Sequence, residues 1–318
     1  MPTQKPSSAS DSQLSRRRLL QCGAAAGAGL YLGAGAAKTR GAKQAATLRV
    51  MTYNILNGGT ELGTLEQTAL VIQRANADLI GVQEAKDSGP RLAKLCGLHW
   101  HKQEGNGCGV LSRFPIVEHD PQHCGACVQL PDERRVWLMN CHLPPNPYQP
   151  YQLAQIPYGE DNPFIETAAE AIAEAIRARG AQLARLLMAI GRAERLAAPV
   201  FVTGDFNEPS HLDWTPRAAA RKRCTLPVAW PTSRALVDAG LVDSYRAVHP
   251  DELRQPGLTW TPTPAEQDVM DRIDLVYHSS RGVTCRTAEI VGEKQSTSDI
   301  VVAPYPSDHR AVVCEFEL

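Results

Sequence analysis

Short apolar runs alternate along this chain with segments in which apolar residues recur every three or four positions. Seven of the short runs are followed by turn-type residues, which predicts buried β-strands. Their limits are 48–54, 78–84, 107–112, 135–142, 199–205, 273–278 and 311–317. The mixture of strands and helical segments predicts a layered α/β domain.

Two segments have the spacing of amphipathic helices. We expect Glu66–Ala75 to form a helix that packs between the first two strands. A longer stripe lies within Phe164–Leu196, and a straight helix of that length would span about 50 Å. That is too long for a compact domain, so we expect a break near Gly180. The stripe consists of Ile165, Ala169, Ile172, Ile176, Leu183, Leu187 and Ile190.

A proline-rich stretch at 144–158 follows the fourth strand. Its five prolines predict an irregular loop. The stretch carries Tyr148 and Tyr151, whereas Trp260 lies in a second loop at 256–267. We expect these aromatic side chains to contact substrate from opposite walls of a cleft. The alternative is that the stretch is a rigid surface connection.

Residues 1–40 have the composition of a targeting segment. Ser15-Arg-Arg-Arg-Leu-Leu-Gln21 is close to a twin-arginine export motif, and Cys22–Ala37 is a weakly apolar stretch rich in Gly and Ala. The stretch is too short and too rich in Gly to span a membrane, so no transmembrane segment is expected in the mature chain. This pattern predicts a signal peptide and leader at 1–40, and one domain at 47–318. The expected location is periplasmic or extracellular.

The net charge of the chain without this leader bears on its binding partners. Residues 1–40 hold six of the 33 Lys and Arg residues and one of the 34 acids, so 27 bases and 33 acids remain, a net charge of −6. Proteins that bind long nucleic acids usually carry a basic footprint. The excess of acids over bases disfavours nucleic acid as a partner without excluding it. A basic groove near Arg217 and 221–223 is an alternative to a solvated helix face. We expect a monomer.

Eight cysteines follow the leader, and export would permit disulfides. Cys124 and Cys127 form a single CxxC pair without further Cys or His at zinc-finger spacing, so a local disulfide or thiols are expected instead of a zinc site. Cys141 and Cys314 lie inside strand patterns and are expected to be buried small hydrophobes.

Polar side chains stand at the ends of several apolar runs. In sheet enzymes ligands bind at the mouth formed by strand ends, so we expect these groups to converge on one cleft. Asn54, Glu84 and Asp308 offer oxygen ligands that fit a hard divalent ion such as Mg²⁺, Mn²⁺ or Ca²⁺.

Other strand-end residues suit hydrolysis at phosphorus. Asp205 could orient or deprotonate water while Asn207 holds a phosphoryl oxygen, although both could simply form an Asx turn. His309 could donate a proton or stabilise negative charge, and Asp274 is the expected acceptor that orients it. The alternative for Asp274 is a structural ion pair with Arg272.

The ordered motifs resemble those of the endonuclease/exonuclease/phosphatase superfamily over residues 48–318. They are Tyr-Asn at 53–54, Gln-Glu at 83–84, Ser-Arg-Phe-Pro-Ile at 112–116, Asn-Cys-His-Leu at 140–143, Gly-Asp-Phe-Asn at 204–207, Arg-Ile-Asp at 272–274 and Ser-Asp-His at 307–309. The resemblance implies a four-layer sandwich of two packed mixed β-sheets flanked by helices, with the site at one end.

The resemblance also implies roles for individual residues. Glu84 would bind the catalytic metal with help from Asn54 and Asp308, and His309 would contact the phosphate. His142 matches the histidine of the deoxyribonuclease-I-like, sphingomyelinase-like and inositol-phosphatase-like branches, which counts against a repair endonuclease. The implied catalytic residues are His142, Asp205, Asn207, Asp274 and His309.

Three functions agree with these motifs. The first is a divalent-metal-dependent phosphoester hydrolase in which water attacks a phosphodiester or phosphomonoester in line, with a small or lipid-linked substrate. The second is an extracellular deoxyribonuclease-I-like endonuclease, which the acidic charge disfavours. The third is a non-catalytic binding member of the same fold, which the complete set of polar residues disfavours.

Overall fold

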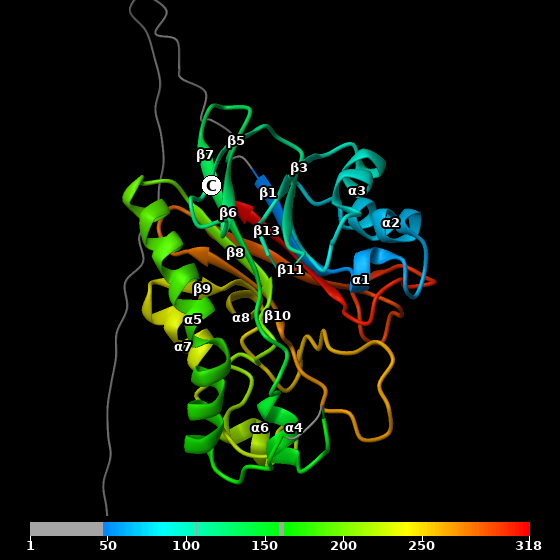
Figure 1. Ribbon diagram of the computed structural model, residues 1–318, viewed down its shortest axis with the longest axis vertical. Helices are drawn as coiled ribbons and strands as arrows, with labels where there is room; N and C mark the ends of the chain where they lie inside the picture. Colours follow the sequence, from blue (N-terminus) through cyan, green and yellow to red (C-terminus); the bar gives the residue numbers. More distant parts are fainter. Residues whose placement is uncertain (1–46, 106, 159–161) are drawn as a thin grey trace, which may run out of the picture. The chain divides into compact units, whose positions relative to one another are not determined.

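Two mixed β-sheets pack face to face in the computed structural model, which describes residues 47–105, 107–158 and 162–318 (Figure 1). The larger sheet has seven strands in the order β12-β11-β13-β1-β2-β4-β3. Its strands are β1 (Thr47–Asn54), β2 (Leu79–Gln83), β3 (His99–Lys102), β4 (Gly109–Ser112), β11 (Thr284–Gly292), β12 (Ile300–Val301) and β13 (Ala311–Glu317).

The smaller sheet has six strands in the order β5-β6-β7-β8-β10-β9. Its strands are β5 (Ile116–His119), β6 (Gly125–Gln129), β7 (Arg135–His142), β8 (Val200–Asp205), β9 (Leu241–Asp243) and β10 (Asp274–Ser279). Strand β7 runs parallel to β8, and β10 runs antiparallel to β8. The C-terminal ends of β7 and β8 therefore share one edge of the sheet with the N-terminal end of β10.

Helices cover the outer faces of both sheets (Figure 1). Helices α2 (Leu65–Ala75) and α3 (Gly89–Cys96) pack on the seven-stranded sheet, and α5 (Ala168–Arg195) and α7 (Pro231–Asp238) pack on the six-stranded sheet. The remaining helices are α1 (Leu56–Gly59), α4 (Gln149–Ala154), α6 (Pro216–Ala220) and α8 (Ser244–Val248).

Alternation of side chains along the strands explains the layers. In β1, Val50 belongs to the apolar cluster between the sheets, whereas Met51 packs against the helices outside. In β8, Phe201 joins the cluster between the sheets and Val202 contacts the α5 and α7 side. The result is the four-layer α/β sandwich that the family resemblance implies.

Helix α5 differs from its prediction in two ways. It is continuous over 28 residues, so the expected break near Gly180 is wrong. Its buried face also differs from the expected stripe, since Ile176 is 54 % exposed whereas Arg179 is fully buried. The helix packs against both the sheet and the α4 region. Small alanines occupy several of its buried positions, and a pattern based on large apolar residues does not reveal them. The buried face consists of Ala171, Ala175, Arg179, Leu183, Leu186, Ala189, Ile190 and Ala193.

The proline-rich stretch is not entirely irregular, because α4 forms within it. Pro150 lies in the first turn of α4, where the missing N–H breaks no helical hydrogen bond. Six strands were absent from the sequence prediction: β3, β5, β6, β9, β11 and β12. Edge strands such as β3 and β5 are half exposed and lack a continuous apolar run, so their sequences resemble loops.

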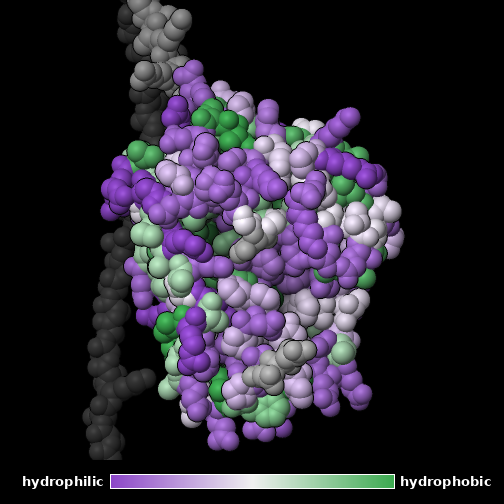
Figure 2. Space-filling model, viewed as in Figure 1, coloured by the Kyte–Doolittle hydropathy of each residue, from purple (hydrophilic) through white to green (hydrophobic). Residues whose placement is uncertain are grey.

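The predicted leader at 1–40 lies outside the described residues, so the structure does not describe it. Among the described residues, no helix combines the length and apolar character needed to cross a membrane. No disulfide joins any of the eight cysteines in the described part of the chain. Cys314 is fully buried as expected, whereas Cys141 is only half-buried. The face seen in Figure 2 is mostly hydrophilic, with apolar side chains in small groups.

Candidate active site

Strand ends from both sheets bring the expected polar residues together. Asp205 pairs in register with His142 on one side and with Asp274 on the other. Asn54 ends β1 and Glu84 follows β2, and these two strands are parallel neighbours. His309 lies two residues before β13, which runs antiparallel to β1. The pairing of these strands therefore places the carboxylate, amide and imidazole groups at one end of the sandwich.

Asn54 links two of the carboxylates. Its Nδ2 donates to Oε1 of Glu84 at 3.1 Å and to Oδ2 of Asp205 at 2.9 Å. Its Oδ1 accepts the backbone N–H of Leu56 at 3.0 Å. The fully buried amide thus fixes the orientation of both acids. Whether its oxygen also contacts a metal ion stays a prediction.

Glu84 is held in an unusual backbone conformation. Its φ of +60° lies in the left-handed region, which non-glycine residues seldom adopt. Its Oε2 accepts the backbone N–H of Asn57 at 2.8 Å. Both carboxylate oxygens therefore have fixed partners, and the side chain is only half-buried at the mouth of the site.

His309 forms a short chain with two aspartates. Its Nδ1 lies 2.9 Å from Oδ2 of Asp274, and its Nε2 lies 3.7 Å from Oδ2 of Asp205. Burial disfavours the charged imidazole, but Asp274 and Asp205 outweigh it and raise the pKa of His309 to about 10. The two carboxylates thus favour the protonated imidazole, in which Nδ1 donates to Asp274.

Two hydroxyl groups that the sequence pattern did not single out hold the backbone of Asp274 and His309 in place. Oγ1 of Thr259 accepts the backbone N–H groups of Ile273 and Asp274 at 3.1 Å each. Oγ of Ser307 donates to the carbonyl of Asn54 at 2.7 Å and accepts the N–H of His309 at 3.1 Å. Ser307 was visible as part of its motif, whereas no local signal marks Thr259.

Asp205 lies at the centre of the site, between two imidazoles. It is 1 % exposed at its side chain, and its Oδ2 lies 3.5 Å from Nε2 of His142. Its Oδ1 accepts the backbone N–H of Asn207 at 2.9 Å. The Asx turn considered as an alternative is thus present, and it coexists with a buried position facing the cavity.

Asn207 is fixed by its own side chain. Its Nδ2 donates to the carbonyl of Leu143 at 2.9 Å, and its φ is +46°. Phe206 between the two polar residues is fully buried against the α5 side of the sheet. Phe206 therefore anchors the turn, as the alternating pattern predicts.

Asp308 completes the acidic edge of the site and fits a divalent cation. Its buried Oδ1 has no hydrogen-bond partner among the described residues. Burial raises the pKa of Asp308; His309 opposes this, while repulsion from Glu84 and Asp205 adds to it. A partly desolvated carboxylate beside two other acids is costly unless a cation neutralises the group. The oxygens of Glu84 and Asp308 suit such an ion.

A second cluster meets the distance requirement for a metal. One ligand atom from each of Asp205, Asp274 and His309 lies within 4.8 Å of the others. However, Nδ1 of His309 and Oδ2 of Asp274 already form a hydrogen bond with each other. The oxygens of Glu84 and Asp308 therefore remain the predicted ligands for the cation.

These groups surround a hollow of about 190 Å³, here called the strand-end cavity. Tyr148, Tyr151 and Trp260 line it, so the structure places all three predicted aromatic residues at the site; Tyr158 lines it too. The hydroxyl of Tyr148 donates to Asp271 and that of Tyr151 to Asp268, both at 2.8 Å. These bonds join the 144–158 stretch to the loop at 256–271. The other residues that line the strand-end cavity are Glu84, His142, Pro145, Asp205, Asn207, Ile273, Asp308 and His309.

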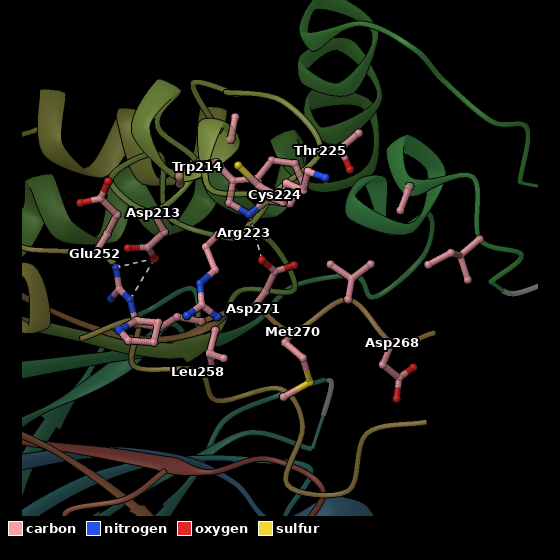
Figure 3. A pocket seen from close by; sticks show the side chains of 18 of the residues that line it. Asp213, Trp214, Arg223, Cys224, Thr225, Glu252, Leu258, Asp268, Met270 and Asp271 are labelled. Carbon is pink, nitrogen blue, oxygen red and sulfur yellow. Dashed lines mark hydrogen bonds and ion pairs between the residues drawn. The ribbon is translucent and has the colours of Figure 1, made fainter. Parts of the chain in front are cut away.

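A larger hollow of about 550 Å³ lies on the other side of Asp271 (Figure 3). Nε1 of Trp214 donates to Oδ1 of Asp271 at 2.8 Å, so Asp271 contacts the walls of both cavities. Asp213 is likewise engaged by Arg246 and Arg272. None of the catalytic groups described above lines this hollow, and its carboxylates already have partners.

Arg272 does not pair with Asp274, so that structural alternative is wrong. Its guanidinium instead binds Asp243 through two nitrogens at 3.0 and 2.8 Å and Asp213 through Nε at 3.0 Å. Arg272 is 1 % exposed. This buried network fixes the start of β10 and leaves Asp274 available to His309.

Comparisons with known proteins agree with this geometry. Residues 51–309 match the model of the Endonuclease/Exonuclease/phosphatase family. A curated relative, the "Uncharacterized protein F14F9.5" of Caenorhabditis elegans, is 26 % identical over 293 residues, covering 85 % of this chain and 91 % of that protein.

Solved structures share the fold at low sequence identity. An AP endonuclease from Archaeoglobus fulgidus has a TM-score of 0.54 at 15 % identity, covering 84 % of this chain and 98 % of that one. D. rerio TDP2 complexed with single-strand DNA product has a TM-score of 0.52 at 16 % identity, covering 86 % and 99 %. An endonuclease/exonuclease/phosphatase from Beutenbergia cavernae has a TM-score of 0.53 at 18 % identity, covering 86 % and 72 %.

The family match spans most of the chain, and the two-sheet architecture and the strand-end acids accord with it. The chain therefore belongs to the Endonuclease/Exonuclease/phosphatase family and is a phosphoester hydrolase.

Proposed function

We propose that this enzyme hydrolyses a small phosphate ester, with a divalent cation held by Glu84 and Asp308. The observation that carries the proposal is the position of Asp205. Its carboxylate lies between Nε2 of His142 and Nε2 of His309, at 3.5 and 3.7 Å, and faces the strand-end cavity. A buried carboxylate placed in this way can orient a water molecule for attack on phosphorus.

The other residues have complementary tasks. Nε2 of His309 points a charged N–H toward the cavity because Nδ1 is engaged by Asp274. Nε2 of His142 and the amide of Asn207 border the same space. These donors would stabilise negative charge on the phosphoryl oxygens in the transition state. A divalent ion would add positive charge at those oxygens when bound.

Two observations favour a small substrate over a long polymer. The strand-end cavity holds about 190 Å³, and no Lys or Arg is among its described lining residues. Residues after position 40 carry a net charge of −6. Phosphate-backbone binding normally relies on several basic side chains. An aromatic wall of Tyr148, Tyr151, Tyr158 and Trp260 suits the organic part of an ester.

Activity on a substrate panel tests this function. Purified enzyme with Mg²⁺, Mn²⁺ or Ca²⁺ should cleave chromogenic phosphodiesters or phosphomonoesters, and a chelator should stop the reaction. Plasmid cleavage across a salt titration examines the nuclease alternative in parallel. Efficient plasmid cleavage with no turnover of small esters would contradict the proposal.

We further propose that the enzyme is exported through its twin-arginine motif. The support is the sequence Ser15-Arg-Arg-Arg-Leu-Leu-Gln21 followed by a Gly/Ala-rich stretch. Residues 1–46 fused to a reporter should direct it out of the bacterial cytoplasm. The R16K/R17K double variant should retain the reporter inside; equal export of both fusions would contradict the motif's role.

A further inference from the structure

A third hollow, the flanking cavity, borders the site on the side of His142. It holds about 340 Å³ and shares His142 with the strand-end cavity. Helix α5 contributes Gln182 and Arg185 to its lining, and the turn between β5 and β6 contributes Gln122 and His123. Because His142 lines both hollows, a ligand that extends past this imidazole would enter the flanking cavity.

The two cavities differ in their charges. The described lining of the strand-end cavity has Glu84, Asp205 and Asp308 but no Lys or Arg. Arg185 is the single Lys or Arg among the described residues that line the flanking cavity. A substrate whose phosphate is held at the first site and which extends past His142 would thus meet an arginine in the second.

Arg185 is not engaged elsewhere in the described structure. Its guanidinium makes no ion pair or hydrogen bond with the described residues, and the side chain is exposed. Two other arginines of α5 are occupied: Arg177 binds Glu174 at 2.7 Å, and Arg192 pairs with Asp120. Arg185 is therefore available for a ligand, at no loss of an existing contact.

The backbone that carries Arg185 is fixed. The next residue, Leu186, is 2 % exposed and packs against the six-stranded sheet with Ala189. The acid in the flanking cavity, Glu104, lies 3.5 Å from Nε2 of His123 and has a highly exposed side chain. The charge of Glu104 is thus screened by solvent, which leaves Arg185 as the principal charged group for an anion.

We propose that Arg185 is a specificity-determining residue that binds a second phosphate of the substrate. This inference rests on the proposed function, since it places the scissile phosphate in the strand-end cavity. The substrate class is then a small ester with two phosphate groups separated by a sugar-sized spacer that passes His142. A guanidinium suits this task because its planar N–H groups bind two phosphate oxygens at once.

Two chromogenic esters form a matched pair for the test. Thymidine 5′-(p-nitrophenyl phosphate) has one phosphate, and its 3′-phosphorylated derivative has a second. Both release p-nitrophenolate, so a difference in rate reports on the second phosphate. We expect the wild-type enzyme to prefer the bisphosphate by about tenfold in kcat/KM, the size of one partly exposed charge-assisted contact.

Substitution of Arg185 should remove this preference. In R185Q, the ratio of the two kcat/KM values should fall to about one, through a higher KM for the bisphosphate, and R185K should retain part of it. R177Q is the matched control on the same helix and should keep the wild-type ratio. A ratio near one in the wild type, or an equal ratio in R185Q and the wild type, would overturn the inference.

Binding separates failure of this inference from failure of the proposed function. Calorimetry with Mg²⁺ compares thymidine 3′,5′-bisphosphate with thymidine 5′-phosphate. Tighter binding of the bisphosphate by the wild type, lost in R185Q, supports the inference even if neither ester is hydrolysed. An absence of turnover would contradict only the proposed function, whereas equal binding of both nucleotides would overturn the role of Arg185.

Discussion

Nδ1 of His309 lies 2.9 Å from Oδ2 of Asp274, and both side chains are buried, although only His309 lines the strand-end cavity. His309 lies two residues before β13 of the larger sheet, and Asp274 begins β10 of the smaller sheet. The contact therefore joins the two sheets. It fixes the imidazole with Nδ1 protonated and Nε2 toward Asp205. Catalysis should therefore depend on this contact even though Asp274 is remote from a substrate in the cavity.

Asp274→Asn should lower kcat by about 10²-fold, the usual effect of removing one preorganised electrostatic group. The amide cannot hold the imidazole as a cation in the same orientation, while the substrate contacts remain. Steady-state kinetics with a chromogenic ester should show a much smaller change in KM. Asp238→Asn, at an exposed position, is the control. Full activity in the Asp274 variant would show that the contact is structural.

Glu84→Gln and Asp308→Asn should each raise the metal concentration needed for half-maximal activity. Each change removes a negatively charged oxygen ligand from the proposed cation site, where carboxylates are preferred. Titration with Mn²⁺, followed by calorimetry as well as by activity, should show weaker binding in both variants. Unchanged binding in both would place the cation elsewhere, for example at Asp205, Asp274 and His309, whose ligand atoms lie within 4.8 Å of each other.

Glu208 should make stability fall as pH rises. Burial raises the pKa of this carboxyl to about 7, although Arg179 acts in the opposite direction. Because the folded pKa exceeds the unfolded value of 4.5, the contribution is fully present below about pH 4.5 and is lost as pH rises through 7. The shift corresponds to a loss of at most about 3 kcal/mol in the free energy of unfolding.

Glu208→Gln tests this pH dependence, because the amide stays neutral at every pH. Urea unfolding at pH 5 and pH 8 should show a smaller fall in stability for the variant than for the wild type. Glu194→Gln, at an exposed position of α5, should behave as the wild type does. The same fall in the Glu208 variant would assign the pH dependence to other groups.

Asp243→Asn should destabilise the fold by about 3–5 kcal/mol, because it leaves the buried guanidinium of Arg272 without one of its two acids. Arg272 donates to Asp243 at 3.0 and 2.8 Å, and Asp243 also caps α8. Denaturant unfolding measures the loss. A decrease below about 1 kcal/mol would show that Asp213 alone neutralises the arginine.

Much of the architecture followed from local patterns in the chain. Runs such as 48–54 and 135–142 are apolar and bounded by turn residues, and they form β1 and β7 nearly as predicted. Polar residues that end these runs, such as Asn54 and His142, had to lie at strand ends wherever the strands were placed. The motifs therefore identified most of the candidate site before any contact was known.

Tertiary packing decided what local patterns could not. Helix α5 stays continuous through Gly180 because the six-stranded sheet and the α4 region support it along its length. Edge strands β3 and β5 form because a neighbouring strand completes their hydrogen bonds, which no short window of sequence reveals. Thr259 likewise acquires its role only because β10 starts beside it.

The sequence by itself determined the order of the strands in the chain and the chemical groups at their ends, because both depend on neighbours within a few residues. Only the tertiary structure decided which groups meet. Arg272 binds Asp213 and Asp243, not Asp274 two positions away, because long-range contacts select its partners. The distances that link Asp205, His142 and His309 arise in the same way, from the pairing of remote strands.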